Sequence, residues 1–441
     1  MNDLDGDDCG PSQMAHRLKP SDLAGVLAEV VGSGALCERD DVVVLYDLDR
    51  MESVLVDLAA AFPKSSIHTI AVKANPLVEI LVRIRERGFG VEVASIGEVQ
   101  LAIQAGFAPD QIVFDSPAKT RGELVAALDA GLTINANCIA EVDRIAELWP
   151  GRASQPSQIG VRVNPGVGAG EIDSTSTAKR ASKFGVPLDH CPELLKDRLH
   201  EHAWITGVHT HIGSQGMAVE QLGEGVGSVA DLDEDVRGYA NLNRFNLGGG
   251  LPVGYRSDDL PTTFAEYSAA LRLRAPGIFD ADTSLGTEFG RAVHANSGWV
   301  ASRIEYVLDH GDNIPTLVVH VGADMFVRKA YRPTDWHHDM SVTTRDGALR
   351  NGDTRLFRVA GPLCFAGDYL SDGIELPADT EEGDFLLIRD AGAYTFSMWS
   401  VYNSRRFPAV LGYADHGKAI HQLREAQTVG DLVAFWSVGT R

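Results

Sequence analysis

The chain has 441 residues, 44% hydrophobic and 23% charged, which is typical of a soluble globular protein long enough for two or three domains. Its net charge of −22 excludes the basic surface that binding to nucleic acid or anionic membranes requires. No apolar stretch approaches the ~20 residues that cross a bilayer, and the acidic start MNDLDGDDCG is unlike a secretory signal, so we expect a cytoplasmic protein.

Short apolar runs alternate with amphipathic segments along the first 300 residues. Residues 1–40 combine an acidic start with one helical stretch, and VVVLYD at 42–47 is a first strand-like run. The eight runs between residues 65 and 291 are IHTIAVKAN, GFGVEVAS, QIVFDSP, LTINAN, QIGVRVNP, ITGVHTHIGS, RFNLGGG and TSLGTEFG. Between them lie segments such as IGEVQLAIQAGF and TRGELVAALDAG, with apolar residues at three- and four-residue spacing. Eight strands that alternate with helices over about 250 residues predict a closed, TIM-like (β/α)8 barrel.

The pattern changes after residue 300. RIEYVLDH, TLVVHVGA, RLFRVAGPLC, FLLIRDAGAY and FPAVLGY are strand-like, and turns rather than helices connect several of them. We therefore expect an α/β protein with three parts. These are an N-terminal extension at 1–44 that partly joins the second domain, a barrel at 45–300, and a mostly β domain at 301–441.

Ionisable or glycine-rich residues stand where nearly every barrel strand ends. They are Lys73, Glu92, Asp115, Asn137, Arg162, His211, Gly248 to Gly250, and Glu288 to Arg291. In a barrel of this kind the catalytic groups lie at the carboxyl ends of the strands, so these residues are expected to share one rim. A rim of solvated loops would hold more Ser, Thr and Asp, and the pattern favours an active site.

Lys73 lies in AVKANP, at the end of the first barrel strand, because Pro76 prevents that strand from continuing. A lysine there is either a solvated rim residue or a reactive amine. NLGGGLP, with backbone N–H groups at Gly248–Gly250 that can approach a phosphate, and TEFGR, with Arg291, both suggest an anion site. A flexible turn explains three glycines alone equally well. Both segments follow strands seven and eight, however, where barrels often bind phosphate.

A reactive lysine and a phosphate site on one rim point to pyridoxal 5′-phosphate, held by Lys73 as a Schiff base. Glu288 is then the candidate partner of the pyridine nitrogen, because a carboxylate keeps that nitrogen protonated and the ring able to accept electrons. His211, in HTHIGSQ, could lie flat against the ring, although a structural histidine is the alternative.

The motifs resemble those of the fold-type III pyridoxal-phosphate decarboxylases, the group of diaminopimelate decarboxylase and eukaryotic-type ornithine decarboxylase. In chain order they are AVKANP, GFGVEVASIGE, VRVNP, SKFG, GVHTHIGSQ, NLGGGLP, TEFGR, GPLCFAGDYL and GAYTFSMWSVYNSRRFP. Each is weak alone, but together they run from residue 71 to residue 408 in the family's order. The resemblance implies an amino-acid decarboxylase with an alanine-racemase-like arrangement of barrel and β domain. It also implies a homodimer with shared active sites.

The resemblance assigns roles to single residues. Lys73 would carry the cofactor, His211 would stack on its ring and Glu288 would pair with the pyridine nitrogen. The remaining cofactor-binding residues that it implies are Glu92, Arg162, Ser214, Gly248, Gly249, Gly250, Gly290, Arg291 and Tyr394. Cys364, in GPLC, would cross the dimer interface and protonate the α-carbon after carbon dioxide leaves. Without its flanking motif, a cysteine there would be a small buried hydrophobe.

Two segments depart from the family pattern and bear on the substrate. Phe365 stands where the family has Glu or Asp to bind the distal ammonium of a diamino acid, a charge-assisted bond worth about 1.5–3 kcal/mol. Asp368 is the nearest carboxylate that could substitute. Arg328 and Tyr331 lie near the segment that binds the distal carboxylate in the diaminopimelate enzymes, one residue short of the family's spacing. We therefore expect a modified or conjugated amino acid as substrate rather than a simple diamino acid.

Three other functions are open on the residues alone. His209 with His211, and His337–Asp339, are possible ligands in a metal-dependent barrel hydrolase, but a metal explains neither the glycines nor Lys73, and no metal is expected. A racemase would need a second base on the opposite face of the cofactor, and the GPLC and GAY segments favour decarboxylation instead. A non-catalytic regulator should have lost the lysine or the phosphate residues.

Overall fold

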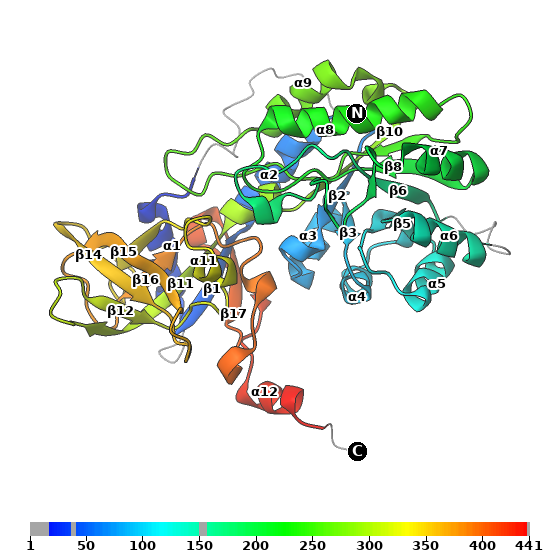
Figure 1. Cartoon of the computed structure of the whole chain (residues 1–441). Coiled ribbons are helices and arrows are strands. Elements are labelled where there is room, and N and C mark those ends of the chain that lie inside the picture. The colour runs from blue at the N-terminus through cyan, green and yellow to red at the C-terminus, as the bar shows by residue number, and fades with distance from the viewer. Residues whose placement is uncertain (1–16, 37–40, 150–156, 439–441) are drawn as a thin grey trace, which may run out of the picture.

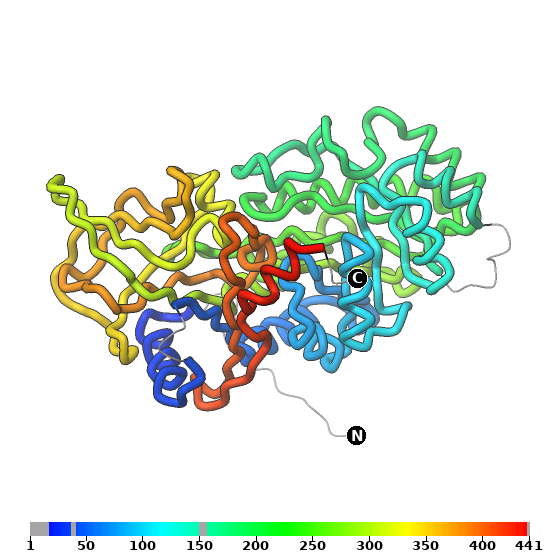
Figure 2. Tube along the Cα trace, turned by 90° about the horizontal axis from the view of Figure 1, so that it is seen from below, coloured from blue at the N-terminus to red at the C-terminus, as the bar shows by residue number. Residues whose placement is uncertain are grey.

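The structure, a computed structural model, describes residues 17–36, 41–149 and 157–438 (Figure 1). It confirms the predicted architecture of a closed parallel barrel joined to a second domain made mostly of sheet. The two parts lie side by side (Figure 2). The acidic start expected at residues 1–16 lies outside the described residues. No helix in the described part of the chain is long and apolar enough to span a membrane.

The barrel closes because eight parallel strands pair in a ring, in which β5 pairs with β6 to complete the circle. The strands are β2 (Ile67–Ala71), β3 (Gly90–Val93), β4 (Ile112–Phe114), β5 (Thr133–Ala136), β6 (Ile159–Asn164), β8 (Ile205–His209), β9 (Arg244–Asn246) and β10 (Ser284–Phe289). The helices around them are α2 (Leu48–Ala61), α3 (Val78–Glu86), α4 (Ile96–Gln104), α5 (Arg121–Ala130), α6 (Ile139–Leu148), α7 (Pro192–Glu201), α8 (Val219–Val236) and α9 (Phe264–Arg274). A two-residue strand, β7 (Val186–Pro187), pairs with β6. Each of the eight predicted runs supplies one barrel strand.

Local sequence decides where these helices begin and end, as α5 illustrates. Thr120 caps the helix by accepting the N–H of Glu123, and the Glu123 carboxylate accepts the N–H of Thr120 in return. Gly131 ends the helix with a φ of 83°, a left-handed conformation that glycine adopts without strain. Leu124 and Leu128, four residues apart, are fully buried and form the face that packs on the barrel.

In the part of the chain that the structure describes, the second domain contains nine strands in one sheet system. They are β1 (Val42–Asp47), β11 (Gly298–Leu308), β12 (Thr316–Val319), β13 (Met340–Thr343), β14 (Thr354–Ala360), β15 (Tyr369–Pro377), β16 (Phe385–Ile388), β17 (Ala409–Ala414) and β18 (Ala419–Arg424). β1 precedes the barrel in sequence but pairs with β11 and β17. β13, β15 and β18 had no counterpart among the predicted runs, because partly exposed polar residues interrupt their apolar pattern.

Two helices complete this domain at the chain's ends. α1 (Pro20–Gly32) packs on the sheet through Leu23, Leu27 and Val30, which form a small core with Trp299 and Leu411. α12 (Val429–Trp436) follows the last strand and projects away from the body of the molecule (Figure 1). A second, larger core contains the barrel interior and continues into the second domain through residues such as Ile304, Leu317 and Phe357.

Candidate active site

Lys73 and Glu92 form a contact at the carboxyl end of the barrel. β2 ends at Ala71, and Lys73 lies in the single 3-10 turn that follows, Val72–Ala74. The Nζ of Lys73 donates to Oε2 of Glu92, on the neighbouring strand β3, at 2.5 Å. Glu92 is fully buried, whereas 34% of the Lys73 side chain is exposed. The amine is therefore held by a buried carboxylate, whereas the side chain that carries it is partly exposed.

The pKa values of Glu92 and Lys73 are both raised, for different reasons. Burial raises the pKa of Glu92 to about 8; the Lys73 ammonium opposes that shift, and the carboxylates of Glu288 and Asp115 add to it. Desolvation alone would lower the pKa of Lys73, but attraction to Glu92, Tyr394 and Glu288 raises it above its ordinary value. The acidic neighbours therefore favour the protonated form of the Lys73 amine.

Three buried carboxylates converge on the barrel centre. Oxygen atoms of Glu92, Asp115 and Glu288 lie within 4.8 Å of one another. Arg162 donates from Nη1 to Oδ2 of Asp115 at 2.9 Å, and although burial would raise the pKa of Asp115, this guanidinium holds it well below its usual range. Asn246 donates to Oε1 of Glu288 at 2.8 Å, while the buried Oε2 of Glu288 has no hydrogen-bond partner. A buried acceptor of this kind is normally satisfied, which points to a ligand group in front of Glu288.

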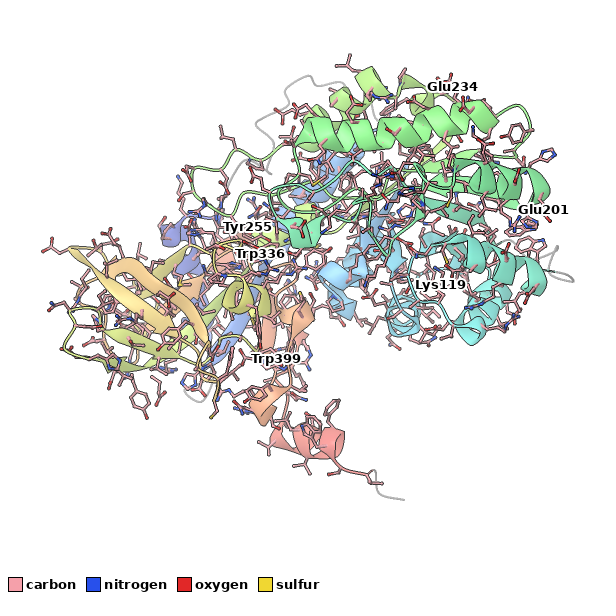
Figure 3. The ribbon with its side chains drawn as sticks, in the orientation of Figure 1. Lys119, Glu201, Glu234, Tyr255, Trp336 and Trp399 are labelled. Atoms are coloured by element: carbon pink, nitrogen blue, oxygen red, sulfur yellow. The ribbon has the colours of Figure 1, made fainter. Side chains whose placement is uncertain are left out.

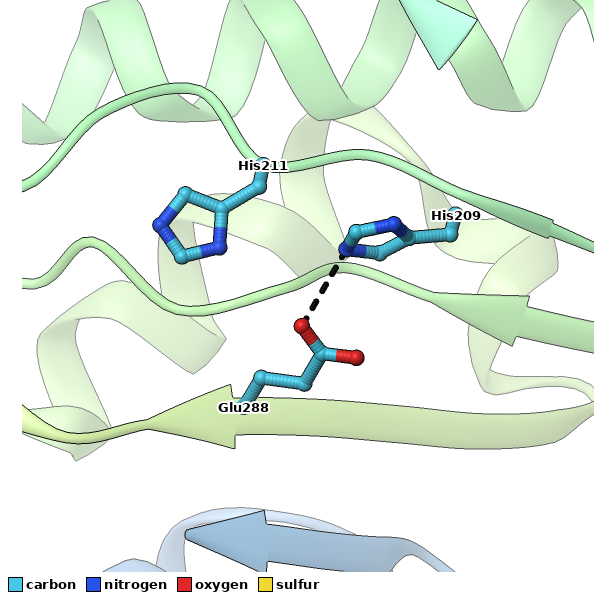
Figure 4. Close-up of side chains that lie close together, drawn as sticks. All are labelled: His209, His211 and Glu288. Atoms are coloured by element: carbon cyan, nitrogen blue, oxygen red, sulfur yellow. Dashed lines mark ion pairs between the residues drawn. The ribbon is translucent and has the colours of Figure 1, made fainter. Parts of the chain in front are cut away.

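Two histidines at the end of β8 face this centre (Figure 4). His209 is fully buried, and its Nε2 lies 3.2 Å from Oε2 of Glu288. His211, two residues later, has its ring centroid 6.4 Å from that of His209. Burial, together with the nearby Arg162 and Lys73 charges, lowers the pKa of His211 well below its ordinary value. His211 is therefore a neutral, flat ring, and its Nδ1 lies 3.3 Å from the N–H of Gly249.

The glycine run after β9 passes so close to the neighbouring strands that no side chain would fit. A Cβ atom on Gly248 would lie 2.4 Å from the carbonyl oxygen of Thr210, and one on Gly249 would lie 2.3 Å from that of Glu288. Gly248 and Gly250 also have φ values of 70° and 100°, which favour glycine. The backbone N–H groups of this run can approach an anion closely.

Arg291 extends the same cradle from the end of β10, as the first residue of α10 (Arg291–His294). Its Nε donates to Oγ of Ser214 at 3.1 Å, and its Nη1 donates to the hydroxyl oxygen of Tyr255 at 2.7 Å. A Cβ on Gly290 would lie 2.9 Å and 3.0 Å from the Cβ atoms of Ala71 and Ala74, and the Tyr394 hydroxyl lies nearby at 3.4 Å. Ser214, Gly290, Arg291 and Tyr394, all predicted phosphate ligands, lie together.

The second domain supplies Tyr394 and Arg328 to this rim. The N–H of Tyr394 donates to the carbonyl oxygen of Ala74 at 3.1 Å, and Tyr394 holds a left-handed φ of 56°. The Arg328 guanidinium, on α11 (Val327–Tyr331), lies 4.6 Å from the centroid of the Tyr394 ring. Its Nη1 is buried without a hydrogen-bond partner. Burial, with the charge of Arg291, lowers the pKa of Arg328 to about 10.

Trp336 and Tyr255 enclose these arginines at the boundary between the two domains (Figure 3). Their rings meet edge to face, with centroids 5.8 Å apart. The guanidinium carbons of Arg291 and Arg328 lie 5.0 Å and 4.9 Å from the centroid of the Trp336 ring. This end of the site is therefore positively charged and lined by aromatic rings.

Three predicted residues lie on an exposed loop rather than beside Lys73. The N–H of Cys364 donates to Oδ1 of Asn403 at 2.7 Å, and the Cys364 thiol is exposed. Phe365 is 36% exposed and stacks on Tyr331, with ring centroids 5.6 Å apart and planes at 21°. Asp368 is buried and accepts the N–H groups of Ala323 and Leu363, so its carboxylate holds the base of this loop.

Sequence reasoning missed several residues of the site. Asn246, which binds Glu288, stands two positions before the glycine run, and Tyr255, which binds Arg291, stands five positions after it. Their positions beside a glycine-rich anion loop are the sequence feature from which a role in the site could have been predicted. His209 was considered only as a metal ligand, because nothing in a linear sequence places it beside the end of β10.

The two histidine groups of the metal hypothesis do not meet. His209, His211 and Glu288 are close enough to hold an ion. His337 instead contacts Asp339 at 2.6 Å, and Nδ1 of His338 donates to the carbonyl oxygen of Arg389 at 2.8 Å. Within the described residues, no group of three potential ligands includes either of them.

Comparison with known proteins identifies relatives over nearly the whole chain. Residues 48–295 match the family model described as the pyridoxal binding domain of pyridoxal-dependent decarboxylases. The chain is 33% identical over 420 residues to a diaminopimelate decarboxylase of Pseudomonas aeruginosa, covering 93% of this chain and 96% of that protein. A diaminopimelate decarboxylase of Archaeoglobus fulgidus is 31% identical over 368 residues, covering 82% and 85%.

A solved structure supports the same comparison. The diaminopimelate decarboxylase of Helicobacter pylori, complexed with L-lysine, superimposes with a TM-score of 0.80 at 26% identity, covering 92% of this chain and 98% of that one. The lysine/ornithine decarboxylase of Vibrio vulnificus shares the fold, with a TM-score of 0.72 at 20% identity.

Proposed function

Because this chain belongs to the family of pyridoxal-dependent decarboxylases, we propose that it removes the α-carboxyl group of an amino acid whose side chain is larger than that of a simple diamino acid. The chain is a carboxy-lyase that uses pyridoxal 5′-phosphate. Membership of this family therefore argues against the racemase and the metal-dependent hydrolase considered above. The substrate and the roles of single residues are what we propose here.

The rim residues fit pyridoxal phosphate in three respects. The Lys73 side chain, which would hold the cofactor covalently, is partly exposed and lies at the end of a barrel strand. The buried Oε2 of Glu288 makes no hydrogen bond within the protein, although Nε2 of His209 lies 3.2 Å away, and it would face the pyridine nitrogen. Gly248 to Gly250, with Ser214, Arg291 and Tyr394, form a cradle of donors that would hold the phosphate.

Bound pyridoxal phosphate supplies an electron sink for the electron pair that remains when carbon dioxide leaves the α-carbon. Glu92 accepts a hydrogen bond from Nζ of Lys73 and so orients the amine that would hold the cofactor. Arg162 forms an ion pair with Asp115 and so holds that carboxylate in place at the barrel centre. His211 is neutral and flat, so it can pack on a planar ring without adding a charge.

The α-carboxylate that departs would lie in a water-poor site. Glu92, Asp115, Glu288 and His209 are all buried at the barrel centre. A desolvated carboxylate is destabilised relative to neutral carbon dioxide, which favours the bond cleavage. The cationic, aromatic end of the site at Arg328 would bind a distal anionic group of the substrate through the free Nη1.

The observation that carries the substrate proposal is the stacking of Phe365 on Tyr331. At the position of Phe365 the family has an acidic residue that binds a distal ammonium group. Two stacked aromatic rings offer apolar surface instead and leave a substrate ammonium without a charged partner. We therefore favour an amino acid whose distal amine is absent or is covered by a conjugated group.

A screen for carbon dioxide release tests this proposal. The panel contains diaminopimelate, lysine and ornithine, and each of them acylated or otherwise conjugated on the side chain. Wild type should prefer conjugated substrates, and Phe365→Glu should gain roughly 10- to 150-fold in kcat/KM on the free diamino acids, the equivalent of one charge-assisted bond. Phe365→Leu, the matched variant without charge, should show no such gain.

Free diaminopimelate as the best substrate of the wild type would contradict the proposal. So would a Phe365→Glu variant with the same substrate ranking as Phe365→Leu.

We also propose a homodimer in which Cys364 serves the active site of a second copy. Cys364, Phe365 and Tyr331 lie on an exposed loop and helix, and the hydroxyl of Tyr402, 50% exposed, donates to the carbonyl oxygen of Cys364. On α12, four apolar side chains are 59–65% exposed: Val429, Val433, Phe435 and Trp436. Exposed apolar surface of this extent is typical of a contact between proteins. A second copy covering it would bring the Cys364 thiol to the α-carbon as the proton donor.

A further inference from the structure

His209 lies between two buried carboxylates. Its Nε2 is 3.2 Å from Oε2 of Glu288 (Figure 4), and its Nδ1 is 3.7 Å from Oδ2 of Asp115. Its side chain is completely buried, and neither nitrogen makes a hydrogen bond with any described residue, so the two carboxylates contact it only as ion-pair neighbours. A histidine buried only to fill a core would not have both nitrogens aimed at acidic groups.

The two nearby cationic side chains form close ion pairs with carboxylates other than Glu288. Lys73 pairs with Glu92, and Arg162 pairs with Asp115. Among the described residues, Glu288 has one ion-pair partner within 4.0 Å, His209, and one neutral amide, Asn246. His209 and Asn246 are therefore the contacts through which the protein can direct the Glu288 carboxylate.

The strand register explains why His209 is in this position. Arg162 on β6 is paired in register with His209 on β8, and His209 is paired in register with Asn246 on β9. In-register residues of adjacent parallel strands point to the same side, so the three side chains form one row that faces the carboxylates. Arg162 holds Asp115, Asn246 holds Glu288, and His209 stands between them.

We propose that His209 is a positioning residue that lies between Glu288 and Asp115 and keeps the Glu288 carboxylate directed at the ring nitrogen of the cofactor. The inference rests on the proposed role of Glu288 in holding that nitrogen. His209 does not touch the substrate in this account. It acts through Glu288, as the outer partner of a bound group acts through the ligand that it orients.

The experiment is ¹⁵N NMR of the holoenzyme, loaded with pyridoxal phosphate labelled at the ring nitrogen and kept free of substrate. The variants are His209→Leu, which removes both contacts, and His209→Gln, which keeps a neutral donor. His68→Gln is the matched control, because His68 lies on β2 and binds Thr287 rather than the carboxylates. In parallel, pyridoxal phosphate is titrated into each apoprotein to measure its dissociation constant.

We expect a protonated ring nitrogen in wild type and in His68→Gln. In His209→Leu the nitrogen signal should shift to that of the unprotonated ring, with about 10- to 100-fold weaker cofactor affinity, as on removal of an outer partner of a metal ligand. His209→Gln should give an intermediate signal. If His209→Leu does not fold, His209→Gln and Asp115→Asn carry the test, and both should shift the signal in the same direction.

A folded His209→Leu or His209→Gln variant with the wild-type nitrogen signal and affinity would overturn the role of His209 and leave the proposed function intact. An unprotonated ring nitrogen in wild type would instead overturn the role of Glu288, and the present inference with it.

Discussion

Arg328 is the residue at which stability and function are expected to diverge. Its guanidinium is buried, lies over the rings of Trp336 and Tyr394, and has an Nη1 without a partner. A buried charge without a full set of partners lowers the free energy of unfolding, and a bound anion would offset that loss.

Arg328→Gln should therefore weaken substrate binding without weakening the fold. A charged hydrogen bond is worth about 1.5–3 kcal/mol, so we expect KM to rise roughly 10- to 150-fold. The melting temperature should stay the same or increase, because an unpaired buried charge has been removed. Arg332→Gln, on an exposed neighbour paired with Asp335, is the control and should change neither quantity. An unchanged KM in Arg328→Gln would remove Arg328 from the substrate site.

Sequence motifs identified those site residues whose chemical type is distinctive and missed those of common type. Lys73, Glu288 and Arg291 stand at strand ends, where an isolated ionisable residue after an apolar run is unusual. Asn246 and Tyr255 are of common types, and only the folded barrel brings them to Glu288 and Arg291.

At the scale of the element, the glycine run after β9 should tolerate no side chain. A Cβ on Gly249 would lie 2.3 Å from the carbonyl oxygen of Glu288, so backbone must move and the cradle must widen. We expect Gly249→Ala to destabilise the protein by about 1–3 kcal/mol and to weaken the binding of pyridoxal phosphate. Denaturant unfolding of the apoprotein and cofactor titration measure the two effects.

Gly223 provides the contrast within the same barrel. It lies inside α8, and a Cβ there would meet no atom within 4 Å. Gly223→Ala should therefore stabilise the protein by about 0.5–1 kcal/mol, the usual gain from replacing glycine by alanine in a helix, and leave cofactor binding unchanged. If Gly249→Ala and Gly223→Ala changed stability and cofactor affinity equally, the close approach at Gly249 would not matter for cofactor binding.

Periodicity located the barrel elements because each barrel strand is buried on both faces and reads as a continuous apolar run. It failed for β15 and β18, whose outward residues are exposed and polar, such as Asp372 and His421. It also could not show that β1, ahead of the barrel in sequence, pairs with β11 and β17, because pairing between distant strands leaves no local signal.

At the scale of the whole molecule, the proposed dimer makes each active site depend on two chains. Lys73→Ala and Cys364→Ala should each be nearly inactive as homodimers. When the two are unfolded, mixed in equal amounts and refolded, half of the dimers should pair different chains, and each of these should contain one intact site.

The mixture should therefore recover about a quarter of the wild-type activity. A mixture of Lys73→Ala with Glu288→Gln, both on the same side of the site, should recover none and serves as the control. If the first mixture also recovers nothing while size measurements show dimers, Cys364 does not act across the interface.

The central claim is that Lys73 anchors pyridoxal phosphate, and one measurement tests it directly. The holoenzyme is reduced with borohydride, which makes the bond between the lysine and the cofactor permanent, and is then digested and analysed by mass spectrometry. Lys119 is an internal comparison, because it is equally close to the barrel strands but its Nζ already donates to the carbonyl oxygens of Ser116 and Asn135. We expect the cofactor mass on Nζ of Lys73 and on no other lysine. Label on Lys119 or elsewhere, or a reduced protein with no labelled peptide, would contradict it.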